Sequence, residues 1–162
     1  MDDVLYPLAE ETGQALKTKG WMLATAESCT GGWVGEIVTA VPGSSAWYDR
    51  GFITYTNASK QEMLGVQAQT LQQFGAVSEE TVREMASGTL LHSQAHISLA
   101  ISGVAGPGGG SPGKPVGTVC FAWAIKDGTV KSERCQFPGD RREVRRLAVE
   151  HALRGVLALL QL

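Results

Sequence analysis

The stretch WMLATAESCTGGWVGEIVTAV, residues 21–41, decides the fold, because its pattern changes abruptly in the middle. Residues 21–27 form a short apolar run of the length expected for a buried strand. Residues 29–41 place apolar residues at helical spacing, and the turn sequence PGSS follows. Ser28 therefore stands where a predicted strand ends and a predicted helix begins.

The rest of the chain continues this alternation of strands and helices. Asp127-Gly128 signals a hairpin between the last two predicted strands, and Asp140 with Glu143 three residues later opens the last helix as a capping box. The pattern predicts an α/β fold, with a mixed sheet covered by helices on both faces. We find no internal repeat or domain boundary, so residues 1–162 are expected to form a single domain. The other predicted strands are 50–56, 96–103, 116–125 and 130–137, and the other predicted helices are 3–19, 57–65, one that begins after Ser78, and 139–160.

Composition narrows the class of protein. Apolar residues make up 43% of the chain and charged residues 19%, which is typical of a compact soluble domain. The formal net charge of -2 gives no global basic field, so nucleic acid is not the expected partner. No apolar run approaches the roughly 20 residues that cross a bilayer, and the acidic start MDDVLYPLAEE is wrong for a secretory signal.

The cysteines and histidines lack the spacing of a metal site or a disulfide framework. Cys29, Cys120 and Cys135 are odd in number and contain no CxxC pair, so we expect reduced thiols in a cytoplasmic protein. The three histidines show no metal-ligand spacing either, and His151 is expected to pack near the apolar stripe of the last helix.

Two familiar motifs are matched only in part. Residues 108–114 match GxxxxGK, but Pro115 replaces the Ser or Thr that holds magnesium, and a strand is predicted where a phosphate-binding helix should begin. Tyr55 and Lys60 are separated by four residues rather than the three of short-chain dehydrogenases, and no GxGxxG opens a helix after the first strand.

Ser28 is the strongest candidate for chemistry. Backbone amides at a helix start carry partial positive charge, and Gly31 and Gly32 leave room for a ligand against the backbone. A serine nucleophile needs a base, and Lys60 serves if burial lowers its pKa, with Tyr55 placed to pass the proton. The alternatives are ordinary: Ser28 or Thr30 as a helix cap, Lys60 as a solvated helix residue and Tyr55 as a half-buried strand aromatic.

Cys29 is a second candidate nucleophile in the same stretch, although a thiol that faces the core is the simpler interpretation. The residues alone leave a Ser–Tyr–Lys hydrolase as one hypothesis among these alternatives.

Five segments in order resemble the CinA C-terminal domain family: TAESCTGG, GSSAWYDRGFITYTNASK, GAVSEETVREMA, SGVAGPGGG and KPVGTV. The resemblance covers nearly the whole chain. It implies a three-layer α/β/α fold, a homodimer, and hydrolysis of nicotinamide mononucleotide (NMN) to nicotinate mononucleotide and ammonia, with no cofactor and no metal. The activity of the upstream pyrophosphatase-like domain that many relatives carry is not expected here.

The same resemblance implies site residues at matching positions. The nucleophile falls on Ser28, the tyrosine on Tyr55 and the lysine on Lys60. It also places a substrate contact on Ser45, a hydroxyl on Ser102 where relatives often carry threonine, and an arginine on Arg142, with Arg141 as the adjacent candidate. The loop residues beside the strand ends are further expected substrate contacts: Thr30, Gly31, Gly32, Gly103 and Gly106.

The 5′-phosphate has two candidate holders, one of the arginines at the start of the last helix or the amides of Gly106 to Gly110. Arg146 is expected to lie on a solvated face. The rival function from another class is a non-catalytic module that binds a pyridine or adenine nucleotide for regulation.

Overall fold

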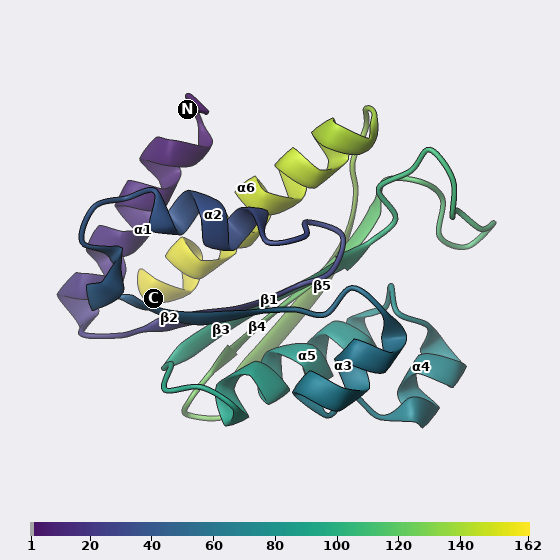
Figure 1. The fold of residues 1–162 in the computed structure, drawn as a ribbon, viewed down its shortest axis with the longest axis horizontal. Coiled ribbons are helices and arrows are strands. Elements are labelled where there is room, and N and C mark those ends of the chain that lie inside the picture. Colours follow the sequence, from purple (N-terminus) through teal and green to yellow (C-terminus); the bar gives the residue numbers. More distant parts are fainter. Residues whose placement is uncertain (1) are drawn as a thin grey trace.

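A five-stranded sheet forms the middle layer of the computed structural model, which describes residues 2–162 (Figure 1). The strand order is β2-β1-β3-β4-β5; β2, β1 and β3 are parallel, and β4 and β5 are antiparallel to their neighbours. In chain order the elements are α1 (Leu5–Lys19), β1 (Leu23–Glu27), α2 (Trp33–Thr39), the 3-10 turn η1 (Ser44–Ala46), β2 (Tyr48–Ile53), α3 (Asn57–Leu64), α4 (Ala68–Phe74), α5 (Glu79–Leu91), β3 (Ile97–Gly103), β4 (Thr118–Ile125), β5 (Val130–Gln136) and α6 (Arg141–Leu160).

Helices cover both faces of the sheet, as Figure 1 shows. α1, α2 and α6 pack on one face, and α3, α4 and α5 lie on the other, with α5 against the central strands. Each face has its own buried apolar cluster, one that includes Leu16, Phe121 and Leu153 and one that includes Met85 and Ala122. The prediction of a three-layer α/β/α sandwich with a mixed sheet is confirmed.

Most predicted elements are present, with shifted boundaries. α2 begins at Trp33 rather than at Cys29, because Gly31 and Gly32 have positive φ angles of 62° and 105°, which a right-handed helix cannot include. The sequence suggests Asn57 as the cap of the short helix after β2, but the structure has Thr56 there, since the Thr56 hydroxyl accepts from the Ser59 amide.

α4 was not predicted at all. Its seven residues contain only Leu71 and Thr70 as buried side chains, so the apolar pattern is too sparse to signal a helix from the sequence. Packing against α5 supplies what the local pattern lacks.

The chain leaves β1 and β2 in opposite directions. After β1 it passes to α2 on one face of the sheet, and after β2 it passes to α3 on the other face (Figure 1). Such a divergence between neighbouring parallel strands opens a crevice beyond their carboxyl ends, where ligands bind in open α/β sheets. The loop of residues 104–117 extends from the same end of the sheet. Among the described residues, no helix combines the length and apolarity needed to span a bilayer.

Candidate active site

Ser28 and Lys60 meet beyond the carboxyl ends of β1 and β2. The Lys60 Nζ donates to Ser28 Oγ over 3.0 Å, although 32 positions separate the two residues. Ser28 follows β1 directly, and its amide still bonds to the Ile101 carbonyl of β3, which fixes the serine at the sheet edge. Strand alternation turns the Ser28 side chain to the face where α3 lies. A hydroxyl and an amine are therefore in direct contact.

Lys60 is buried, contrary to the alternative of a solvated helix residue. Its side chain is 1% exposed, and its ammonium donates to the Thr54 carbonyl at 2.8 Å and to the Tyr55 carbonyl at 3.4 Å. No carboxylate forms an ion pair with it among residues 2–162. Burial without a counter-ion disfavours the charged form and lowers the pKa of Lys60 from 10.5 to about 8. At pH 7, one unit below this pKa, about a tenth of Lys60 is neutral.

A buried carboxylate shapes the loop that carries Ser28. Glu27 is 2% exposed and accepts hydrogen bonds from the Thr30 hydroxyl (2.6 Å) and from the amides of Gly32 (3.2 Å), Val34 (2.9 Å) and Gly35 (3.1 Å). A negative charge is favourable at the first turn of a helix. The sequence pattern does not reveal this role, because Glu27 is simply the last residue of an apolar strand.

The amides that Glu27 occupies are not free for a substrate. The expectation that the start of α2 stabilises an oxyanion is therefore wrong for the Gly32, Val34 and Gly35 amides. Among the described residues, the backbone N–H groups of Cys29 and Thr30 have no acceptor outside their own residue. They directly follow Ser28, which makes them the remaining candidate oxyanion donors.

Thr30 has a structural role. Its side chain is fully buried and its hydroxyl is bound to Glu27, so the hydroxyl does not face a ligand. Neither Ser28 nor Thr30 caps α2, because the N-cap position is Gly32 and no side chain bonds to it there. Gly31 and Gly32 instead supply the positive φ angles that lead from Ser28 into the helix.

Arg145, which the sequence analysis did not select, holds the same loop from the other side. Its Nε donates to the Cys29 carbonyl at 2.9 Å and its Nη2 to the Thr30 carbonyl at 3.2 Å. In a trans peptide the N–H points opposite to the C=O. The bond to the Cys29 carbonyl therefore turns the Thr30 N–H away from α6.

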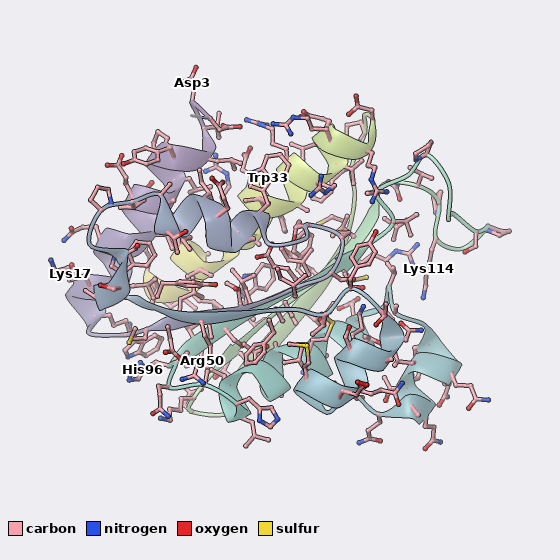
Figure 2. The ribbon with its side chains drawn as sticks, in the orientation of Figure 1. Asp3, Lys17, Trp33, Arg50, His96 and Lys114 are labelled. Atoms are coloured by element: carbon pink, nitrogen blue, oxygen red, sulfur yellow. The ribbon has the colours of Figure 1, made fainter. Side chains whose placement is uncertain are left out.

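A groove next to this loop carries positive charge. It has a volume of about 410 Å³ and is lined by residues of the Ser28 loop, α2 and α6: Thr30, Gly31, Gly32, Trp33, Glu36, Arg142 and Arg145. The guanidinium carbons of Arg142 and Arg145 lie 4.9 and 5.5 Å from the centre of the Trp33 ring. Figure 2 shows Trp33 in this position between α2 and α6. Arg142 has no hydrogen-bond or ion-pair partner among the described residues, so it is available to an anion.

Tyr55 does not stand between lysine and serine. Its side chain is 59% exposed, and its hydroxyl accepts from Arg141 Nη2 at 3.3 Å. The part of Tyr55 that contacts Ser28 and Lys60 is its carbonyl oxygen. Because Lys60 reaches Ser28 directly, a relay through the tyrosine hydroxyl is not required by this geometry.

Arg141 joins two walls of the site. In addition to Tyr55 it donates to the Gly106 carbonyl at 2.8 Å, which ties the 104–117 loop to α6. Ser102 and Gly103 end β3 beside Ser28, and Ser102 is 1% exposed on the face of the sheet that Lys60 approaches. A side chain at Gly103 would collide with Val119, so this glycine is also required by packing.

Ser45 is not brought to this site within the chain. It is exposed in η1, before β2, whereas Ser28 lies at the other end of the parallel β1–β2 pair. The length of β2 separates the two ends by roughly 16 Å, at about 3.3 Å per residue. The expected Ser45 contact is thus unsupported by the position of this residue.

The alternative nucleophile Cys29 faces the core. It is 6% exposed, and burial raises the pKa of its thiol to about 11, which leaves it protonated at neutral pH. The GxxxxGK segment, residues 108–114, does not form a phosphate-binding loop, because Lys114 donates to the Phe74 carbonyl and a strand follows (Figure 2). Arg146, expected to be solvated, instead pairs with Asp2 at 2.8 Å.

Comparison with known proteins places the chain in a family. The model of the CinA C-terminal domain matches residues 5–160. The chain belongs to the CinA C-terminal domain family. It is 53% identical over 153 residues to the nicotinamide-nucleotide amidohydrolase PncC of Enterobacter agglomerans, covering 94% of this chain and 93% of that protein. It is also 53% identical over 152 residues to PncC of Escherichia coli K12, covering 94% and 92%.

A solved structure of the CinA family agrees with the fold. The competence/damage inducible protein CihA from Agrobacterium tumefaciens superposes with a TM-score of 0.96 at 43% identity, covering 98% of this chain and 97% of that one. The CinA C-terminal domain of this chain therefore has the family's architecture from α1 to α6. The resemblance seen in the five sequence segments is confirmed.

Proposed function

We propose that this protein hydrolyses the carboxamide of NMN to nicotinate mononucleotide and ammonia, with Ser28 as nucleophile and neutral Lys60 as its base. The similarity to PncC proteins over nearly the whole chain supports the substrate and the reaction. The observation that carries the mechanism is the 3.0 Å hydrogen bond between Lys60 Nζ and Ser28 Oγ in a buried setting.

The first step is attack of Ser28 Oγ on the carboxamide carbon. Neutral Lys60 takes the hydroxyl proton as the C–O bond forms, and the carbonyl π electrons move onto oxygen. The positive pyridinium ring of NMN makes this carbon more electrophilic. The N–H groups of Cys29 and Thr30 are the proposed donors to the oxyanion, and losing one such donor typically raises the barrier by about 3 kcal/mol.

Collapse of the tetrahedral intermediate then releases ammonia. The Lys60 ammonium returns the proton to the leaving nitrogen as the C–N bond breaks, which leaves an acyl ester on Ser28. Water attacks this ester while neutral Lys60 accepts one of its protons. The second collapse gives nicotinate mononucleotide and restores the Ser28 hydroxyl.

Recognition of the nucleotide is assigned to the groove beside the Ser28 loop. The free guanidinium of Arg142 is the proposed partner of the 5′-phosphate, because Arg141 already donates to Gly106 and Tyr55. Gly31, Gly32 and Gly103 form backbone walls close to the nucleophile. Gly106 contributes through the loop that Arg141 holds in place, and Ser102 is a buried neighbour of the reacting centre.

Ammonia release from purified protein and NMN tests the proposal. Ser28→Ala should abolish the activity, and Lys60→Met should reduce it to a similar extent, with circular dichroism to confirm folding. Lys19→Met, which alters an exposed lysine, is the matched control and should retain activity. Full activity of Ser28→Ala would exclude the serine mechanism, and NMN binding without ammonia release from the wild type would favour a regulatory binding module.

The homodimer implied by the family resemblance is part of the proposal. Ile53 and Tyr55 are 52% and 59% exposed at the end of the edge strand β2, so apolar surface is available there for a second copy. Light scattering on the purified protein measures the mass directly, and a monomer at assay concentration would contradict this part alone.

A further inference from the structure

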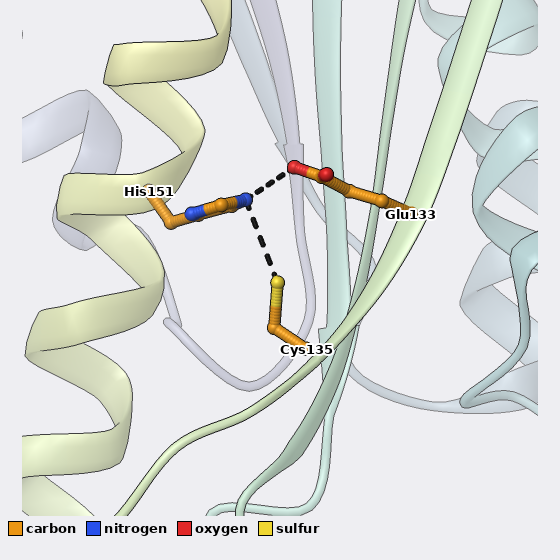
Figure 3. Close-up of side chains that lie close together, drawn as sticks. All are labelled: Glu133, Cys135 and His151. Carbon is orange, nitrogen blue, oxygen red and sulfur yellow. Dashed lines mark hydrogen bonds and ion pairs between the residues drawn. The ribbon is translucent and has the colours of Figure 1, made fainter.

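Three side chains of different chemistry lie close together beside the edge strand β5 (Figure 3). Glu133 and Cys135 lie on β5, and His151 lies on α6. His151 Nε2 lies 3.5 Å from Cys135 Sγ and is also hydrogen-bonded to Glu133 Oε1. One ligand atom from each residue fits within 4.8 Å of the others. No step of the proposed amidase mechanism uses these groups.

The fold fixes this convergence. Glu133 and Cys135 are two residues apart on a strand, so their side chains point to the same face, the one that α6 covers. The His151 ring is held against Phe121, with 4.6 Å between ring centroids, and also contacts Trp123 and Phe137. The expected packed histidine is confirmed, and its packing directs Nε2 toward the two strand residues.

The arrangement does not fit a catalytic relay. In a thiol–imidazole–carboxylate triad, the thiol and the carboxylate bond to different ring nitrogens, so that one nitrogen accepts a proton while the other is held. Here Sγ and the carboxylate both approach Nε2. The three atoms therefore converge on one point, where a cation can bind all of them.

The separations suit a tetrahedral zinc ion. With Zn–S of about 2.3 Å and Zn–N and Zn–O of about 2.1 Å, tetrahedral angles place S about 3.6 Å from N and N about 3.4 Å from O. The observed Sγ to Nε2 distance of 3.5 Å already matches. The Glu133 oxygen needs to move outward from hydrogen-bond contact, and its side chain is 48% exposed and free to rotate.

We propose that Glu133, Cys135 and His151 form a zinc site, with Cys135 Sγ, His151 Nε2 and a Glu133 carboxylate oxygen as protein ligands and solvent as the fourth. Mixed sulfur, nitrogen and oxygen donors are the set that Zn²⁺ takes in proteins. On binding, the thiol proton passes to solvent, and the imidazole keeps its remaining proton on Nδ1. The ion joins the edge strand β5 to α6.

Spacing rules for local zinc motifs did not detect the set, because residues 133, 135 and 151 come from a strand and a distant turn of a helix.

Protection of the thiol from alkylation tests the proposal in the wild-type protein. Cys29 and Cys120 are 6% and 0% exposed, so iodoacetamide should label Cys135 first, as read by mass spectrometry. One equivalent of Zn²⁺ should suppress this labelling, and Co²⁺ should give a thiolate charge-transfer band. Unchanged labelling with Zn²⁺ and no Co²⁺–thiolate band would overturn the proposal.

Calorimetric titration with Zn²⁺ tests the ligand set. Cys135→Ser, His151→Gln and Glu133→Gln should each weaken binding at least about tenfold. Cys120→Ala, which changes a buried thiol on the other face of the sheet, should bind Zn²⁺ like the wild type. Wild-type affinity in Cys135→Ser or His151→Gln would refute the site, and ammonia release from NMN is not involved in either reading.

Discussion

The burial of Lys60 predicts an unusual stability change when this lysine is replaced. In the folded protein the pKa of Lys60 is about 8 because burial disfavours the ammonium, whereas the unfolded chain has the ordinary value of 10.5. A lysine whose pKa is depressed by folding destabilises the folded state wherever the unfolded chain carries the proton. The penalty is complete below about pH 8 and disappears as the pH rises toward 10.5.

The size of the effect follows from the two pKa values. At pH 7 the penalty is about 3.3 kcal/mol, and at pH 10 it is about 0.8 kcal/mol, at 1.36 kcal/mol per pKa unit. Lys60→Met removes the titrating group and keeps a side chain of similar length. The free energy of unfolding of the wild type should therefore rise by about 2.5 kcal/mol relative to Lys60→Met between pH 7 and pH 10.

Urea denaturation of both proteins across this pH range measures the difference. All other titrating groups are shared, so their contributions cancel in the comparison. The absolute stability of the variant at one pH also contains the lost hydrogen bonds to Thr54 and Ser28, about 1 kcal/mol each, which the pH dependence removes from the test. A difference that stays constant with pH would mean that Lys60 has an ordinary pKa, and the role of neutral base would fail with it.

Four further perturbations follow from the site. The logarithm of kcat/KM for NMN should rise with unit slope up to about pH 8 and then level off, because burial sets the pKa of the base Lys60 there. A profile that is flat from pH 6 to 9 would contradict this. Glu27→Ala should reduce the free energy of unfolding by roughly 3 kcal/mol in urea titrations, because it orphans amide donors at the start of α2, whereas Glu36→Gln, an exposed change on the same helix, should have little effect. Arg142→Gln should raise KM for NMN at least about tenfold with little change in kcat, and it should not change the KM for nicotinamide riboside, which lacks the phosphate. Arg145→Gln should lower kcat about a hundredfold, because it releases the Cys29 carbonyl.

Local features of the sequence were enough for most of the secondary structure. A short apolar run predicted β1, period-two alternation predicted β3, and helical spacing predicted α1 and α6. Capping residues such as Ser78 and Asp140 marked helix starts correctly. Gly31 and Gly32, whose φ angles are positive, delay the start of α2 to Trp33, which the helical pattern alone could not reveal. α4 escaped prediction because its stability comes from contact with α5 and not from its own seven residues.

The candidate site divides in the same way. The position of Ser28 at a strand-to-helix junction is a local property, readable from residues 21–41. The place of Lys60 in the predicted helix 57–65 is also readable from its own neighbours, although 32 positions separate it from Ser28. Whether that lysine is neutral depends on what surrounds it. Burial under α3 and the carbonyls of Thr54 and Tyr55 is a property of packing, and so is the exposure of the Tyr55 ring away from the pair.

The sequence by itself therefore determined the order of strands and helices and the types of reactive residues, because these depend on neighbours along the chain. Only the tertiary structure decided which of them touch. It assigned the helix-start amides to Glu27, the Cys29 carbonyl to Arg145, and the Cys135 thiol to His151. These contacts join positions 7, 116 and 16 residues apart. The sequence could not reveal them, because desolvation and hydrogen bonding act through space, whereas sequence periodicity reports only the path of the chain.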